Sequence, residues 1–146
     1  MRPGDWIPLV RCRLGGQDET ESTAVRYVPL SEFELWRHLM ETRHRRPVRV
    51  ESVSVWVSEE AARSNGLTAD DLEPVVRLRL ELPGPVGVPV SVERYIPVET
   101  YPEAREVLLS HFGGSRRPQR VLAGAGYFVP PAAGDERLQS ELLGAA

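Results

Sequence analysis

The sequence contains no lysine, and all 18 of its basic residues are arginine. A Schiff-base nucleophile, a pyridoxal-phosphate anchor and the phosphate-binding residue of a P-loop all require lysine, so three reaction classes are excluded. Cysteine is nearly absent as well, since Cys12 stands alone and no disulfide can form within the chain. Cys12 lies on the apolar face of an alternating segment, which favours a core residue.

Long apolar runs are also missing. No stretch approaches the roughly 18 apolar residues of a membrane span, and MRPGDW does not begin a secretory signal. We therefore expect a cytoplasmic protein without a membrane partner. The net charge of −3 gives no reason to expect direct nucleic-acid binding. The length of 146 residues predicts one domain, 1–146.

Motifs for metal or cofactor chemistry are not found. His38, His44 and His111 fall at or just beyond predicted helix ends and lack the spacing of a metal site. The hydrolase patterns G-x-S-x-G and H-E-x-x-H do not occur. Gly124 and Gly126 lack the context of a dinucleotide fingerprint and instead mark a strand that a neighbour or ligand can approach closely. We expect neither metal nor cofactor.

The segment 74–109 shows the clearest structural pattern. VVRLRLEL and VSVERYIPV alternate between apolar and polar residues around a turn rich in proline and glycine, which predicts a β-hairpin. A helix is expected to follow, with Thr100 and Glu103 as a capping box. Ser31 and Glu34 form the same pattern before an earlier predicted helix.

This segment has a counterpart near the N-terminus. In both places two arginines separated by a single residue precede a tyrosine. Arg11, Arg13 and Tyr27 match Arg77, Arg79 and Tyr95. Residues 45–57 likewise match 116–129. The repeat predicts an α+β fold with a six-stranded antiparallel sheet, helices on one face, and two pseudo-symmetric β-β-α-β-α halves, 5–70 and 71–143.

The polar faces of the two predicted hairpins hold the candidate ligand-binding residues. By alternation these point away from the apolar side of the sheet, and they are Arg11, Arg13, Tyr27, Arg77, Arg79, Glu93 and Tyr95. Four converging guanidinium groups would bind a small organic anion. Cross-strand ion pairs on a solvated face are the alternative interpretation.

A family resemblance rests on three runs, VSEEAARSNGL, VVRLRLELPG and PVSVERYIPVETYPE. They resemble the UTRA domain, the ligand-binding domain of GntR-type bacterial transcription regulators, whose fold is similar to that of chorismate lyase. The resemblance implies a small anionic ligand and implicates Arg77, Arg79 and Glu93. Such domains normally follow a winged helix-turn-helix, which this sequence lacks, so a free-standing domain is expected.

Two functions remain open from the sequence. The first is a sensor or effector-binding module of transcription regulation. The second is a small cofactor-free lyase or cyclase of specialised metabolism, in which Glu93 is the candidate catalytic acid or base. A homodimer is a further expectation, because Trp6 and the PGPVGVP turn are apolar features that nothing in the sequence clearly covers.

Overall fold

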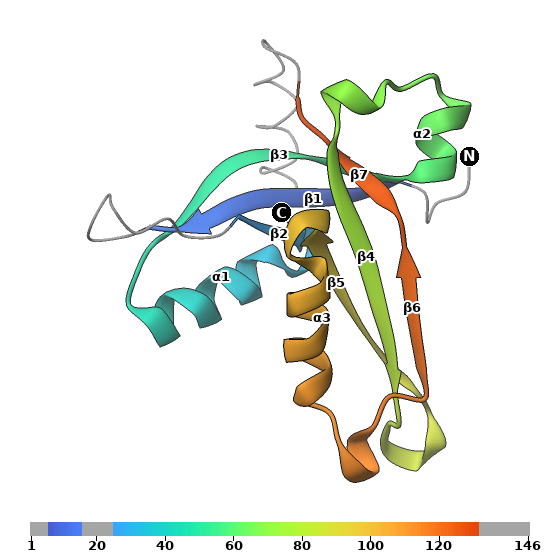
Figure 1. Ribbon diagram of the computed structural model, residues 1–146. Coiled ribbons are helices and arrows are strands. Elements are labelled where there is room, and N and C mark those ends of the chain that lie inside the picture. The colour runs from blue at the N-terminus through green and yellow to red at the C-terminus, as the bar shows by residue number, and fades with distance from the viewer. Residues whose placement is uncertain (1–5, 16–24, 132–146) are drawn as a thin grey trace.

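The computed structural model describes residues 6–15 and 25–131, which form an α+β structure with an antiparallel sheet (Figure 1). The first part contains β1 (Trp6–Leu14), β2 (Arg26–Pro29), α1 (Leu30–His44), β3 (Val48–Ser58) and α2 (Glu59–Ser64). The second contains β4 (Glu73–Leu82), β5 (Val90–Pro97), α3 (Tyr101–Ser110), β6 (Arg120–Gly124) and β7 (Gly126–Val129). The predicted α+β class and antiparallel pairing are confirmed. The last helix of the second predicted half falls after residue 131 and so lies outside the described residues.

The sheet differs from the six-stranded open sheet expected from the sequence. It has seven strands in the described chain, in the order β5-β2-β1-β3-β7-β4-β6, and β5 also pairs with β4. Six of the strands therefore close into a ring. The single strand expected around Gly124 and Gly126 is interrupted at Ala125. After the interruption β7 pairs with both β3 and β4, and the chain bends from β4 towards β3 (Figure 1).

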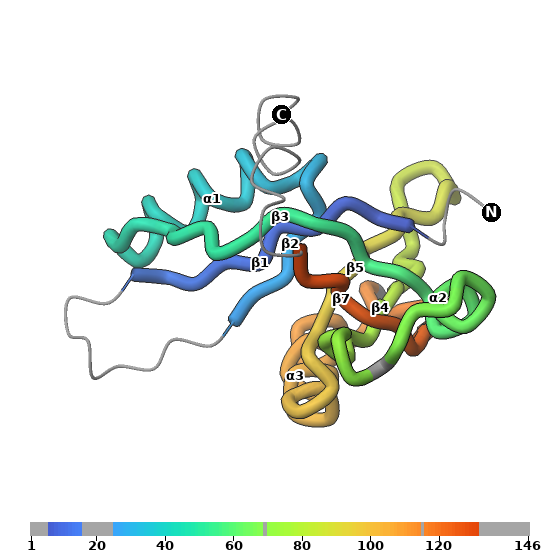
Figure 2. The backbone as a smooth tube through the Cα atoms, turned by 90° about the horizontal axis from the view of Figure 1, so that it is seen from above, coloured from blue at the N-terminus to red at the C-terminus, as the bar shows by residue number. Residues whose placement is uncertain are grey.

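The helices cover the outer face of this closed sheet. Helix α1 lies over the first hairpin and packs Phe33 against Val10, Cys12 and Val53. Helix α3 lies over the second hairpin, at a different end of the sheet (Figure 2). There its apolar side chains meet Leu78, Leu80, Leu82 and Ile96. None of the helices in the described segments is both long and apolar enough to cross a membrane.

The opposite face of the strands is not the solvated surface that alternation alone predicts. It carries a second apolar cluster inside the ring, formed by Leu9, Tyr27, Trp56, Val75, Tyr95 and Phe128. Each of these side chains is buried. Alternation assigns residues to two faces but does not show what covers each face, and here the closure of the sheet turns the arginine-bearing face inward.

The predicted capping boxes do not form. Helix α1 begins at Leu30 directly after Pro29, and no side chain caps it. The Thr100 hydroxyl, at the start of α3, donates to the Pro97 carbonyl at 3.4 Å instead of accepting from the helix. In both hairpins the chain passes from β-strand into helix through a proline, whose fixed φ helps set the direction of the turn.

Candidate functional site

The second hairpin brings four of the predicted site residues together. Arg77 is opposite Tyr95 and Arg79 is opposite Glu93 in the β4–β5 register, so all four side chains share the inner face. The carboxylate of Glu93 is the centre of the group. Its Oε1 accepts from Arg77 Nη2 at 2.8 Å and from Arg79 Nε at 3.2 Å. Its Oε2 accepts from the Tyr95 hydroxyl at 3.1 Å.

The first hairpin forms a corresponding group with different carboxylates. Arg11 is opposite Tyr27, as Arg77 is opposite Tyr95. Glu51 Oε1 lies 2.7 Å from Arg13 Nε and 3.4 Å from Arg11 Nη1. Glu73 Oε2 lies 3.2 Å from Arg11 Nε and accepts a hydrogen bond from the Tyr27 hydroxyl. The seven predicted residues therefore lie in two carboxylate-centred networks, one for each hairpin.

Sequence reasoning missed both carboxylates of the first network. Glu73 could have been found from the sequence, because it lies on β4 an even number of positions before Arg77 and so shares its face. Glu51 could not, because a bulge in the β1–β3 pairing disturbs the alternation at this point. Val25, which stands at the position that matches Glu93 in the repeat, packs against the inner apolar cluster and supplies no carboxylate.

The electrostatics of the second network keep Glu93 ionised. Burial opposes the charged form, but hydrogen bonds from Arg77 and Tyr95 and the positive charges of Arg77 and Arg79 outweigh it, and the pKa of Glu93 is lowered. Burial and the neighbouring carboxylate raise the pKa of Tyr95. Burial and the hydrogen bond to Glu73 raise the pKa of Tyr27 to about 12. Both phenols are therefore neutral donors near pH 7.

An open depression of about 230 Å³ adjoins the second network. Its lining comes from three strands and consists of Trp56, Ser58, Arg77, Arg79, Leu122, Ala123 and Gly124. The guanidinium of Arg77 lies 5.9 Å from the centre of a Trp56 ring, a cation–π distance. The lining as described has two arginines, both paired with Glu93, and no acidic residue of its own.

Two glycines shape this depression in different ways. A Cβ atom at Gly126 would lie 2.3 Å from Cζ2 of Trp56, so the indole packs directly on this backbone. Trp56 is held there by a 2.9 Å hydrogen bond from Nε1 to the Val75 carbonyl. A Cβ atom at Gly124 would meet no atom within 4 Å in the described structure. The close approach expected at these glycines is thus made by Trp56 at Gly126, while Gly124 leaves open space opposite Arg77.

The arrangement suits binding better than proton transfer. A carboxylate with a lowered pKa is a weak base near neutral pH, and Glu93 already accepts three hydrogen bonds. Among residues 6–15 and 25–131, no group of three or more His, Cys, Asp or Glu side chains is placed to hold a metal ion.

Comparisons of the chain with protein-family models, with curated proteins and with solved structures find no match.

Proposed function

We propose that the protein is a binding module for a small organic anion, acting as a UTRA-like sensor or effector-binding domain. The observation that carries the proposal is the depression beside Arg77 and Arg79, where two guanidinium groups border an apolar surface that includes Trp56. Guanidinium groups donate in a planar fork that matches carboxylate and phosphate oxygens. The equivalent registers of the two hairpins support the finer proposal of a pseudo-symmetric, chorismate lyase-like fold. We place this function in the cytoplasm.

Ligand binding is tested by a thermal-shift screen of organic carboxylates and sugar phosphates. A ligand at a hundred times its dissociation constant adds about 2.7 kcal/mol to the free energy of unfolding. Arg79→Ala should abolish the shift produced by a hit while retaining the fold, because the Arg79 side chain is 36% exposed and its truncation removes little packing.

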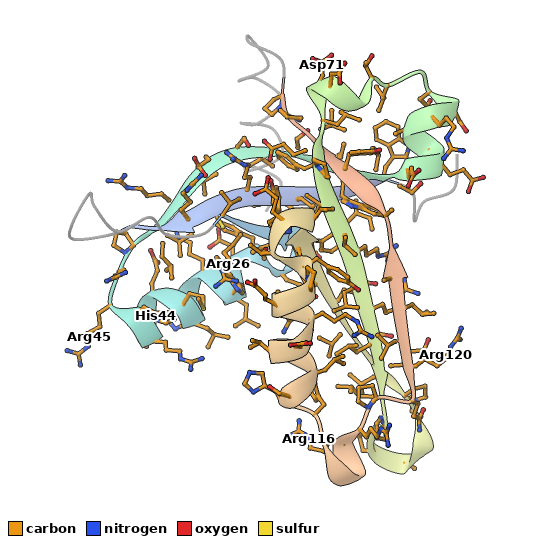
Figure 3. The ribbon with its side chains drawn as sticks, viewed as in Figure 1. Arg26, His44, Arg45, Asp71, Arg116 and Arg120 are labelled. Carbon is orange, nitrogen blue, oxygen red and sulfur yellow. The ribbon has the colours of Figure 1, made fainter. Side chains whose placement is uncertain are left out.

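Arg120→Ala is the matched control. Arg120 lies at the outer edge of β6 (Figure 3), pairs with Glu81 at 3.8 Å and does not line the depression. The Arg120→Ala variant removes the same charge as Arg79→Ala but outside the depression, so ligand binding should survive. A screen without any hit, or equal losses in both variants, would refute a specific anion site at Arg79.

The alternative of a small lyase or cyclase would require Glu93 to transfer a proton. Its lowered pKa disfavours that role, because a base that is largely deprotonated well below neutral pH has little affinity for a proton. Mass spectrometry after incubation with a bound ligand separates the two functions. Turnover that disappears in Glu93→Gln would make the protein an enzyme.

We also propose a homodimer formed through the tip of the β4–β5 hairpin. Trp6 packs in part against Val57, Ala62 and Leu72, so the N-terminal apolar feature is covered within the chain. The hairpin tip stays outside, and Val86 is 98% exposed. Sedimentation at micromolar concentration should give a mass above the 16.3 kDa of one chain. Val86→Asp should shift the measured mass towards the 16.3 kDa of a single chain. A single monomeric species for the unsubstituted protein would end the proposal.

A further inference from the structure

The two arginine pairs differ in what β3 and β6 place beside them. In the first half a bulge makes Glu51 an extra residue of β3, between Val50 opposite Cys12 and Ser52 opposite Arg11. From this position the Glu51 carboxylate contacts both Arg11 and Arg13. One carboxylate from the neighbouring strand therefore bridges the first arginine pair.

The matching strand of the second half, β6, supplies no such group, and the carboxylate that bridges Arg77 and Arg79 belongs to Glu93 on β5. Strand β6 pairs with β4 without a bulge, and Arg79 is opposite Leu122. The register gives Glu51 no counterpart on β6, because Arg49 is opposite Arg13 in the first half as Leu122 is opposite Arg79 in the second. The open depression lies at this place, and Leu122 is part of its lining.

The two arginine pairs meet carboxylates in different ways. In the first half Glu51 contacts both Arg11 and Arg13, and Glu73 also contacts Arg11. In the second half Glu93 contacts both Arg77 and Arg79, and Arg79 uses Nε for this contact. Its two terminal nitrogen atoms carry four further N–H donors, and a guanidinium can bind more than one carboxylate.

We propose, resting on the function proposed above, that the depression binds a small monocarboxylate with a flat or apolar body. Its carboxylate binds the terminal nitrogen atoms of Arg79, whose Nε is held by Glu93. The body of the ligand lies against Leu122, Ala123 and the Trp56 ring, over the space left by Gly124. A volume of about 230 Å³ is below the 300–1,000 Å³ of typical drug-sized pockets, which selects a ligand of few atoms.

The test compares three probes of similar size by NMR titration: benzoate, its neutral analogue benzamide, and phenyl phosphate. Benzoate should bind most tightly, with benzamide weaker by about tenfold or more, because charge-assisted hydrogen bonds to arginine are lost. Tighter binding of phenyl phosphate than of benzoate overturns the carboxylate assignment and leaves organic-anion binding in place. Absence of binding by both anions overturns the assignment and removes its basis in the proposed function.

A matched pair at Leu122 tests the place of the ligand carboxylate directly. Leu122→Glu puts a carboxylate opposite Arg79 and should weaken benzoate binding by about tenfold or more, because the new side chain competes for Arg79 and repels the ligand. Leu122→Gln introduces a side chain of nearly the same shape as glutamate but without its charge, and it should change benzoate binding by less than about threefold. Leu122 is 38% exposed on an edge strand, so both variants should fold. Equal losses in the two variants, with intact unfolding transitions, overturn the proposal.

Discussion

The contact between Trp56 and Gly126 offers a sharp test of how the interior is packed. In Gly126→Ala the new Cβ atom would lie 2.3 Å from Cζ2 of Trp56 and 2.4 Å from the Val57 carbonyl oxygen. Carbon atoms in good contact are about 3.5–4.0 Å apart, so the indole has to move. It cannot do so freely, because it is buried among Leu9, Val75 and other residues of the inner cluster.

The expected loss of stability follows from two effects. Overpacking a well-filled core costs about 1–3 kcal/mol. Displacing the indole also breaks the buried hydrogen bond from Trp56 Nε1 to the Val75 carbonyl, and a buried group left without a partner costs about 1–3 kcal/mol. Alanine recovers at most about 1 kcal/mol through the lower entropy of the unfolded chain. We therefore expect a net destabilisation of about 1–6 kcal/mol.

Gly124→Ala is the control, because the same change on the same stretch of chain meets open space. Its free energy of unfolding should stay unchanged or rise by about 0.4–1 kcal/mol. Urea unfolding followed by tryptophan fluorescence measures both variants, and the melting temperature of Gly126→Ala should be lower by about 3–20 °C. If the two variants unfold within about 0.5 kcal/mol of each other, Trp56 does not pack on Gly126 as described.

Two further predictions concern titrating groups. The pKa of Glu93 is lowered in the fold, so its stabilising contribution is complete above the unfolded pKa of about 4.3 and is lost as the pH falls through the lower folded value. The stability difference between the unsubstituted protein and Glu93→Gln, measured by urea unfolding, should therefore narrow below about pH 4, and a difference independent of pH would contradict this. Burial raises the pKa of the Cys12 thiol to about 12, so a thiol reagent at pH 8 should modify Cys12 only after unfolding, and rapid labelling of the native protein would contradict its burial.

The sequence by itself determined the local structure and much of the residue pairing. Alternation predicted both hairpins and placed Arg77, Arg79, Glu93 and Tyr95 on one face, because side chains on a strand alternate whatever surrounds it. The repeat predicted equivalent roles for Arg11 and Arg77, and the registers agree, since each is opposite a tyrosine. The glycines near position 125 marked a place of close approach, which Gly126 and Trp56 form.

Only the tertiary structure decided what these faces meet. The closing pairs, β5 with β2 and β7 with β3, join strands distant in sequence, and no local pattern encodes them. That closure buries Tyr27 and Tyr95 and brings Glu73 from the second half to Arg11 of the first. It also sets Trp56 beside Arg77, from a strand that sequence reasoning did not connect with the site. The depression depends on these long-range contacts, because its lining comes from three strands that meet only in the folded chain.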